Sequence, residues 1–295
     1  MRPPDPAGTG ASSVEGGSEL LRAAAALVYV SDLEAPAPDP DDVHHLSAVL
    51  RLRQGELVIA SDGVGGWRGC RVRAPGPGAA GSTGPAGGGT GGGSDARDGR
   101  SRHGRHRSPA IVLEPDTEVT QVPRVGPEIT VGASLAKGDR TEWAVTKLSE
   151  LGVDRIMPLI CERTAAGAPR AGRLQRIARE ASMQARRLWL PEFYDPVTFA
   201  EALAILQISA AAAGSPRPAS FPGCIAIAEP GGAPPSLATP VVLVGPEGGW
   251  SPAELALGLP QVCLGPTILR IETAAVVAGT LLTALRSGTV ATTGR

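Results

Sequence analysis

The 295-residue chain has few aromatic residues, widely spaced cysteines, almost no net charge and no long apolar run. Aromatic residues make up 3% of it, so a surface that stacks the bases of a single nucleic-acid strand would be sparse. The four cysteines, Cys70, Cys161, Cys224 and Cys263, form no Cys-x-x-Cys pair. This spacing disfavours a metal site and a disulfide framework, and it favours reduced, mostly buried thiols.

The charge balance and the apolar runs exclude further classes. Twenty-eight basic residues against 29 acidic ones give a net charge of -1, so no global positive field indicates a nucleic-acid partner, although a folded protein can still gather arginine on one face. The longest apolar stretches, such as Thr273–Leu285, are shorter than the ~18–20 residues that span a membrane. Residues 1–17 are polar and lack the apolar core of a signal peptide. We expect a cytoplasmic protein without a membrane span.

The first part of the chain predicts a small β-rich domain. Residues 1–20 are rich in glycine, proline and polar side chains and are expected to be disordered. The predicted elements are a strand at 27–30, a helix at 43–52, a hairpin-like pair of strands at 56–60 and 66–72, and a strand at 110–113.

A biased segment, residues 74–109, interrupts this domain. It holds 12 of the 39 glycines and cannot bury enough apolar surface to offset its chain entropy. We interpret it as a disordered insertion between strands. It ends in an Arg/His-rich tract, residues 97–107, which is either a solvated basic stretch or an arm that contacts phosphates.

The second part of the chain alternates strands and helices. Strands are predicted at 128–134, 155–160, 224–228 and 240–244, and helices at 141–151, 173–187, 199–213 and 272–285. This alternation predicts an α/β domain with a parallel sheet and helices on both faces. The last helix is too apolar to have one wet face, so we expect it in the core or against a second copy of the chain.

Two glycine-punctuated turns near the C-terminus are the most informative motifs. The first, Gly245–Glu254, follows an apolar strand and contains Ser251-Pro252-Ala253-Glu254, which is a helix start signal. The second is Leu264–Ala274. Glycines let the backbone approach a ligand closely, and ligands bind beyond the carboxyl ends of strands in open α/β sheets. Neither turn is followed by the Lys-Ser/Thr of a phosphate loop.

Together the two turns closely resemble the C-terminal signature of the RsmE family, the 16S rRNA uridine-N3 methyltransferases of the knotted SPOUT superfamily. The resemblance extends to Lys137–Arg140, Lys147–Val153, Arg163-Thr164, Arg173–Pro191 and, near the N-terminus, His44–Leu46 with Val49–Arg51. One departure is Thr267, where family members commonly carry arginine.

The resemblance implies the fold and the partners. Residues 126–295 would form a trefoil-knotted methyltransferase domain, and residues 21–125, which include the insertion, a small PUA-like β-barrel that binds RNA. S-adenosyl-L-methionine would be the methyl donor, 16S rRNA in the 30S subunit the substrate, and a second copy of the chain the partner in a homodimer formed through the C-terminal helices. No metal is required for this chemistry.

The resemblance also implies site residues. The donor would contact Val244, Gly245, Glu247, Gly248, Gly249, Leu264, Gly265, Ile268, Leu269 and Thr273. Arg270 would stabilise the uracil anion, and Glu272 would be the base, would orient Arg270, or would only be an acid at a helix N-terminus. RNA phosphates would be contacted by His45, Arg51, Arg53, Arg163, Arg186 and Arg187.

Two alternatives stay open. Another knotted methyltransferase would modify a ribose 2′-oxygen or a tRNA base, and a non-catalytic RNA-binding assembly factor would have kept the fold but lost affinity for the donor. The full pairing of the two turns argues against the first, and the intact glycines argue against the second.

Overall fold

The computed structural model describes residues 19–39, 42, 52–73, 111–170, 172–212 and 224–291. The chain forms two compact units, one of residues 1–62 and 67–120 and one of residues 63–66 and 121–295, and each is described by itself. Disorder was predicted for residues 1–20; residues 1–18 lie outside the described residues, whereas residues 19 and 20 belong to a short helix of residues 19–23. Most of the predicted helix 43–52 and the predicted insertion 74–109 also lie outside the described residues.

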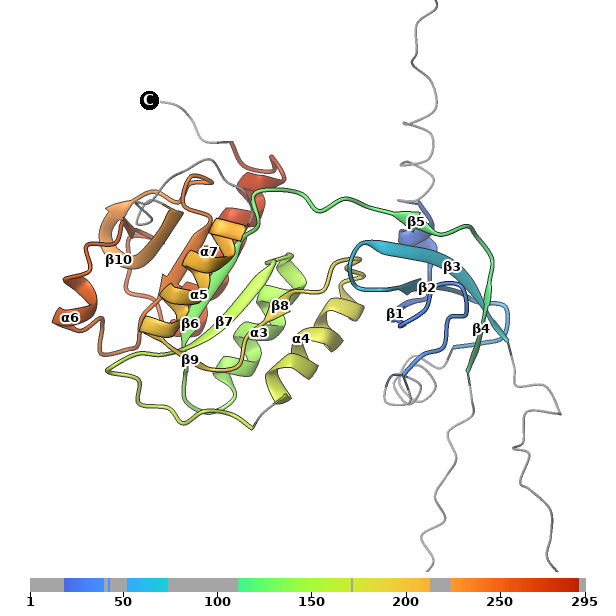
Figure 1. The fold of residues 1–295 in the computed structure, drawn as a ribbon, viewed down its shortest axis with the longest axis horizontal. Coiled ribbons are helices and arrows are strands. Elements are labelled where there is room, and N and C mark those ends of the chain that lie inside the picture. The colour runs from blue at the N-terminus through green and yellow to red at the C-terminus, as the bar shows by residue number, and fades with distance from the viewer. Residues whose placement is uncertain are drawn as a thin grey trace, which may run out of the picture. The chain divides into compact units, whose positions relative to one another are not determined.

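The first unit is built on a five-stranded sheet (Figure 1). Its strands are β1 (Ala26–Tyr29), β2 (Leu57–Ser61), β3 (Gly66–Arg73), β4 (Val112–Pro115) and β5 (Thr120–Gln121). β1 pairs in parallel with β2, whereas β2 with β3 and β3 with β4 are antiparallel. The hairpin-like pair predicted from the sequence is therefore confirmed.

Side chains on one face of this sheet form a small core. Val28, Val58, Ala60 and Cys70 are each fully buried there. Burial raises the pKa of the Cys70 thiol to about 11, although Arg68 nearby opposes the shift. The core of this unit is thus apolar and holds its cysteine as a neutral thiol.

The second unit contains a seven-stranded sheet in which every pairing is parallel. Its strands are β6 (Thr130–Ser134), β7 (Arg155–Ile160), β8 (Glu192–Phe193), β9 (Val197–Thr198), β10 (Ile225–Ala233), β11 (Val241–Val244) and β12 (Gln261–Val262). The order is β12-β10-β11-β6-β7-β8, with β9 also paired to β7. The predicted parallel sheet is confirmed, whereas the two-residue strands β8, β9 and β12 were not predicted.

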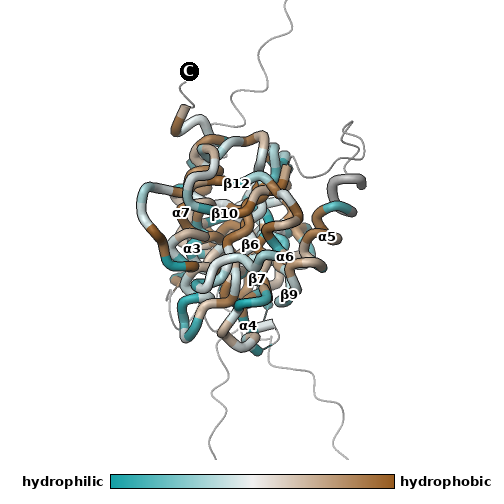
Figure 2. The backbone as a smooth tube through the Cα atoms, turned by 90° about the vertical axis from the view of Figure 1, so that its left-hand side faces the viewer, coloured by the Kyte–Doolittle hydropathy of each residue, from teal (hydrophilic) through white to brown (hydrophobic). Residues whose placement is uncertain are grey.

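Helices cover both faces of this sheet, as predicted. They are α3 (Arg140–Leu151), α4 (Arg173–Gln184), α5 (Phe199–Ala212), α6 (Pro252–Leu255) and α7 (Ile271–Arg286). Side chains of α3, α4 and α7 share one buried cluster with Val242 and Val244 of β11, and α5 shares another with Val241 and Leu243. Successive strand residues point to opposite faces, so β11 contributes to both cores. In Figure 2 the tube has the hydrophobic colour along these central strands.

Helix α7 lies closely against α3. Ala275, Ala278 and Leu282 are fully buried, and a Cβ on Gly279 would lie 2.8 Å from Cδ2 of Leu148 on α3. The opposite face of α7 remains half-buried, for example at Val276. The sequence predicted this helix in the core or against a second copy, and one face is indeed in the core. Within the described part of the chain, no helix is long and apolar enough to cross a membrane.

Candidate methyl-donor site

The first glycine turn leaves β11 and leads into the short helix α6. The Ser251 hydroxyl accepts a hydrogen bond from the Glu254 amide (3.2 Å), and the Glu254 carboxylate accepts one from the Ser251 amide (2.7 Å). This reciprocal capping box, with Pro252 at the first helical position, is the start signal predicted from the sequence. The capping box therefore holds the backbone in place where the turn enters α6.

Trp250 fixes the inner side of the same turn. Its ring lies 5.0 Å from the ring of Phe199 on α5, and its indole N–H donates to the Ala228 carbonyl of β10 (3.2 Å). A Cβ on Gly245 would lie 2.8 Å from Cε2 of Trp250. Glycine is required at this position because the indole occupies the space that a side chain would need.

Two arginines from other elements brace the turn from outside. Arg163 donates from Nη1 to the carbonyls of Gly248 (2.9 Å) and Trp250 (3.3 Å). Arg140, the first residue of α3, places Nη1 at 3.0 Å from Oε1 of Glu247. The backbone of this turn is thus held by side chains distant in sequence.

The second glycine turn is held by fewer contacts. The Cys263 thiol donates to the Gly265 carbonyl (3.2 Å), and a Cβ on Gly265 would meet no atom within 4 Å. Ile268 is 94% exposed, and Arg270 is the exposed N-cap residue of α7. The second turn therefore exposes the side chains of Ile268 and Arg270 to solvent.

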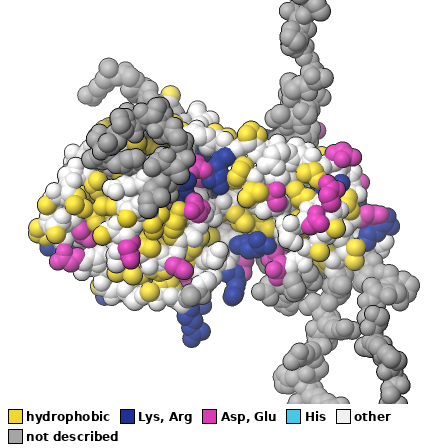
Figure 3. Space-filling view, in the orientation of Figure 1, with side chains coloured by type: hydrophobic (Ala, Val, Ile, Leu, Met, Phe, Trp, Pro, Cys, Tyr) yellow, Lys and Arg dark blue, Asp and Glu magenta, His cyan; other side chains and the backbone are white. Residues whose placement is uncertain are grey.

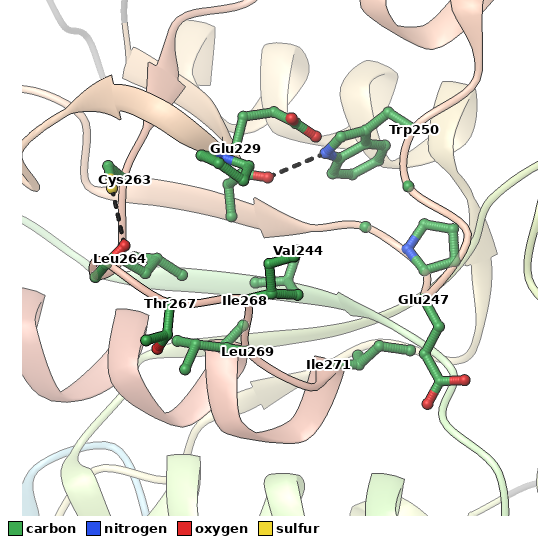
Figure 4. Close-up of a pocket in the computed structure, with 17 residues that line it drawn as sticks. Glu229, Val244, Glu247, Trp250, Cys263, Leu264, Thr267, Ile268, Leu269 and Ile271 are labelled. Carbon is green, nitrogen blue, oxygen red and sulfur yellow. Dashed lines mark hydrogen bonds between the residues drawn. The ribbon is translucent and has the colours of Figure 1, made fainter.

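A cavity of about 310 Å³ lies between the two turns (Figure 4). Eight of the ten residues predicted to contact the donor line it: Val244, Gly245, Glu247, Gly249, Leu264, Gly265, Ile268 and Leu269. Gly248 and Thr273 do not line it. Thr267, the departure from the family pattern, lies on its wall. The structure thus brings the two turns together around one hollow.

Several residues of this wall were not predicted from the sequence. Ala228, Glu229 and Pro230 come from β10, Trp250 lies within the first turn, and Cys263 directly precedes the second. Only these positions in or beside the two motifs could have indicated Trp250 and Cys263. Nothing in the sequence around Glu229 signals a site, because its place depends on the pairing of β10 with β11 and β12.

The two predicted catalytic residues are in contrasting environments. In the part of the chain that the structure describes, the Arg270 guanidinium has no hydrogen bond or ion pair. Glu272 is 8% exposed, its Oε1 lies 3.9 Å from Nη1 of Arg140, and its Oε2 has no hydrogen-bond partner among the described residues. Glu272 does not line the donor cavity. Together with Arg140 it lines a separate, smaller cavity. Arg140 was not among the site residues predicted from the sequence.

The residues predicted to contact RNA belong to both units. Arg163 binds the first turn as described, and Arg187 donates from Nη1 to the carbonyls of Ser149 and Val153, both at 3.0 Å, at the end of α3. Arg186 has a left-handed backbone (φ 54°). Arg53 is exposed in the first unit. His45 and Arg51 lie outside the described residues.

Comparisons with known families agree with this architecture. Residues 124–283 match the family described as RNA methyltransferase domain, and residues 38–80 match the family described as RNA methyltransferase PUA domain. The first match lies in the α/β part of the chain and the second in the β-rich part.

Two relatives and one solved structure are similar over most of their length. Ribosomal RNA small subunit methyltransferase E of Synechocystis is 30% identical, over 82% of this chain and 71% of the relative. The protein of the same name in Mycobacterium bovis is 29% identical, over 81% and 82%. The crystal structure of ribosomal RNA small subunit methyltransferase E from Neisseria gonorrhoeae, bound to S-adenosyl methionine, has a TM-score of 0.59 at 24% identity and covers 89% of this chain and 97% of that one.

Proposed function

The chain belongs to the RsmE family of RNA methyltransferases, and we propose that it methylates N3 of a uridine in 16S rRNA with S-adenosyl-L-methionine as donor. The cavity between the two glycine turns is the single observation that carries this proposal. It is built from the motif residues themselves, at the carboxyl end of β11, where ligands bind in open α/β sheets.

The cavity fits the donor chemically. Its volume of about 310 Å³ lies within the range of ligand pockets, roughly 300–1,000 Å³. Val244, Leu264 and Leu269 give apolar walls for an adenine, and the turns offer backbone hydrogen-bonding groups. The Glu229 carboxylate on the wall (Figure 4) is suited to accept hydrogen bonds from ribose hydroxyls. When bound, the donor supplies an electrophilic methyl group on a positively charged sulfur.

The chain's own residues then have to position the uridine and favour loss of its N3 proton. The pKa of that proton is roughly 9–10, comparable to that of a lysine, so a cation beside the uracil oxygens favours the ionised form. Arg270 is suited to this role because its guanidinium is exposed and has no partner among the described residues. We assign Glu272 to positioning, because its buried carboxylate lies 3.9 Å from Nη1 of Arg140 on α3 and does not line the donor cavity.

The homodimer, the knot and the domain boundaries belong to the same proposal. The outer face of α7 carries the half-buried Val277, Leu281 and Ala284 beside the exposed Thr273 and Thr280, and its apolar side suits a second copy of the chain. We propose that residues 126–295 form the knotted domain and residues 21–125 the RNA-binding domain. Sedimentation equilibrium of the purified chain tests the dimer, and a monomer at micromolar concentration would refute it.

The function is tested with 30S subunits from a strain that lacks this gene. The purified protein and S-adenosylmethionine labelled in the methyl group should transfer label to 16S rRNA, and mass spectrometry of the digested RNA should locate it on N3 of one uridine. A methylated ribose 2′-oxygen or a modified tRNA would indicate another knotted methyltransferase. Calorimetric titration that detects no binding of S-adenosylmethionine would indicate a non-catalytic RNA-binding factor.

A further inference from the structure

A second hollow of about 460 Å³ opens beside the first turns of α3 and α4. None of the residues that line it lines the donor cavity. Its walls carry three cationic side chains, Lys137, Arg170 and Arg173, and one carboxylate, Glu142. We refer to it as the basic hollow.

The basic hollow has an excess of positive charge. Arg173 binds Glu142 through two hydrogen bonds, from Nε (2.5 Å) and Nη2 (2.9 Å), and this contact holds the pKa of Glu142 below its usual value. The Arg173–Glu142 pair therefore adds no net charge to the hollow. Lys137 and Arg170 are exposed, and their charged groups have no hydrogen bond or ion pair among the residues that the structure describes. Two positive charges remain for a ligand.

The backbone adds to this charge, because the two 12-residue helices both begin here. The N-cap residues, Asp139 of α3 and Gly172 of α4, make no side-chain cap hydrogen bond, and α4 has no acidic residue in its first turn. Free N–H groups and the positive end of the helix dipole favour an anion at such a position. Asp139 is not among the residues that line the hollow.

The basic hollow lies on the same edge of the sheet as the donor cavity. Ala136 and Thr141 line both the basic hollow and a small internal cavity of about 20 Å³, whose wall also includes Ile271 and Glu272. Ile271 in turn lines the donor cavity. Figure 3 shows Lys and Arg side chains at the edge where the loop from β7 to α4 runs in Figure 1.

We propose that the basic hollow binds a backbone phosphate of the RNA strand that carries the target uridine, through Lys137 and Arg170. This proposal rests on the proposed function for the identity of the strand. Phosphate contacts fix the register of a nucleic acid on a protein without reading its sequence. The two cations would thereby hold the strand so that its target base reaches the donor cavity.

The test compares Lys137→Gln, Arg170→Gln and the double variant with Arg176→Gln as the matched control. Arg176 is an exposed arginine on α4 that does not line the hollow, so its replacement changes the net charge equally. Binding of 16S rRNA is measured without S-adenosylmethionine over a range of KCl concentrations. Each single hollow variant should weaken binding and reduce the slope of log K against log[KCl] by about 1, and the double variant should reduce it by about 2. Arg176→Gln should leave the slope unchanged.

Melting temperature and calorimetric affinity for S-adenosylmethionine should stay at the parental values in all four variants. A parental salt slope in the double variant, or an equal loss in Arg176→Gln, would overturn the proposal. Titration with inorganic phosphate is a second measurement. If the parental protein binds phosphate saturably, and the double variant loses this binding but keeps its RNA affinity, the hollow binds a free anion instead. Because RNA affinity is measured without donor, a parental protein that binds 16S rRNA without methylating it would refute the proposed reaction and not this site.

Discussion

The two glycine turns that enclose the donor cavity are held in very different ways. The first is filled from inside by Trp250 and bound from outside by Arg163 and Arg140. Among the described residues the second turn receives one thiol hydrogen bond, from Cys263, and its Ile268 is exposed. One turn is therefore preformed, and the other has room to change its conformation when a ligand arrives.

This difference suggests a division of roles. Rigid groups that exist before binding contribute to ground-state affinity, because they cost little entropy to order. Groups that bind only the charge formed during reaction contribute to rate. We infer that the first turn mainly sets affinity for the donor and that the second turn, through Arg270, mainly sets turnover.

The largest effect is expected for Arg270→Ala, in the second turn. Single-turnover methylation of 30S subunits should slow by roughly 10²–10³, the usual cost of removing one group that stabilises transition-state charge. Affinity for S-adenosylmethionine should stay within about twofold, because charge on the uracil appears only during reaction. Arg270→Lys should recover part of the rate, since a point charge lacks the planar fork of a guanidinium. Equal losses of rate and donor affinity would place Arg270 in donor binding instead.

The next effect is expected for Gly245→Val, in the first turn. The new side chain would collide with the indole of Trp250, and overpacking of this kind costs about 1–3 kcal/mol. Calorimetry should show donor affinity reduced by about 10- to 100-fold, with a lower melting temperature and little change in far-UV circular dichroism. Gly265→Val should also reduce donor affinity. A Cβ there meets no neighbour, so its cost in melting temperature comes from backbone strain at φ +157° and not from a collision. Parental donor binding in both variants would refute the assignment of the cavity.

A smaller effect is expected for Arg163→Met, which removes the hydrogen bonds to the Gly248 and Trp250 carbonyls and keeps an unbranched stem. Each hydrogen bond from a charged group contributes about 1.5–3 kcal/mol at most, and exposure of Arg163 reduces this further. Donor affinity should fall by about tenfold. A loss of RNA affinity without a loss of donor affinity in Arg163→Met would favour its predicted role as a phosphate contact.

Ile268→Ala in the second turn should leave the melting temperature unchanged, because that side chain is already in water.

The smallest perturbation is chemical labelling of the cysteines. Burial raises the pKa of Cys70 to about 11 and that of Cys161 to about 12, so both stay protonated at pH 8 and should react slowly with iodoacetamide. Cys263 is partly exposed on the wall of the donor cavity, and Cys224 is partly exposed elsewhere. S-adenosylmethionine should protect Cys263 and leave Cys224 as the internal control. Equal labelling of Cys263 with and without donor would argue that the donor binds elsewhere.

The sequence was most informative where a signal is local. The strand 240–244, the capping box of Ser251 and Glu254, and the helix after Arg270 are each encoded within a few neighbouring residues, and the structure contains all three. The alternation of strands and helices likewise predicted the parallel sheet. These features depend on turn chemistry and periodicity, which a single sequence carries.

Contacts between distant segments were not predictable in the same way. Arg140 reaches Glu247 across more than a hundred residues, and only the completed sheet brings the ends of β6 and β11 side by side. The phosphate contact of Arg163 came from the family resemblance and stays a prediction, whereas its bonds to the Gly248 and Trp250 carbonyls could not be read from the sequence. Strands of two residues, such as β12, are too short to show any periodicity.

The pairing of β6 also has a consequence for the order in which the domain can form. Thr130 of β6 pairs with Arg155 of β7, close in sequence, but its other partner is Val241 of β11. The core beneath it is closed by Ala278 and Leu282 of α7, the last helix of the described chain. Non-local pairing of this kind makes folding slow, because loop-closure entropy is lost before the contacts are gained. During translation the methyltransferase domain can therefore complete its core only once α7 has left the ribosome, so a nascent chain does not yet possess the donor site.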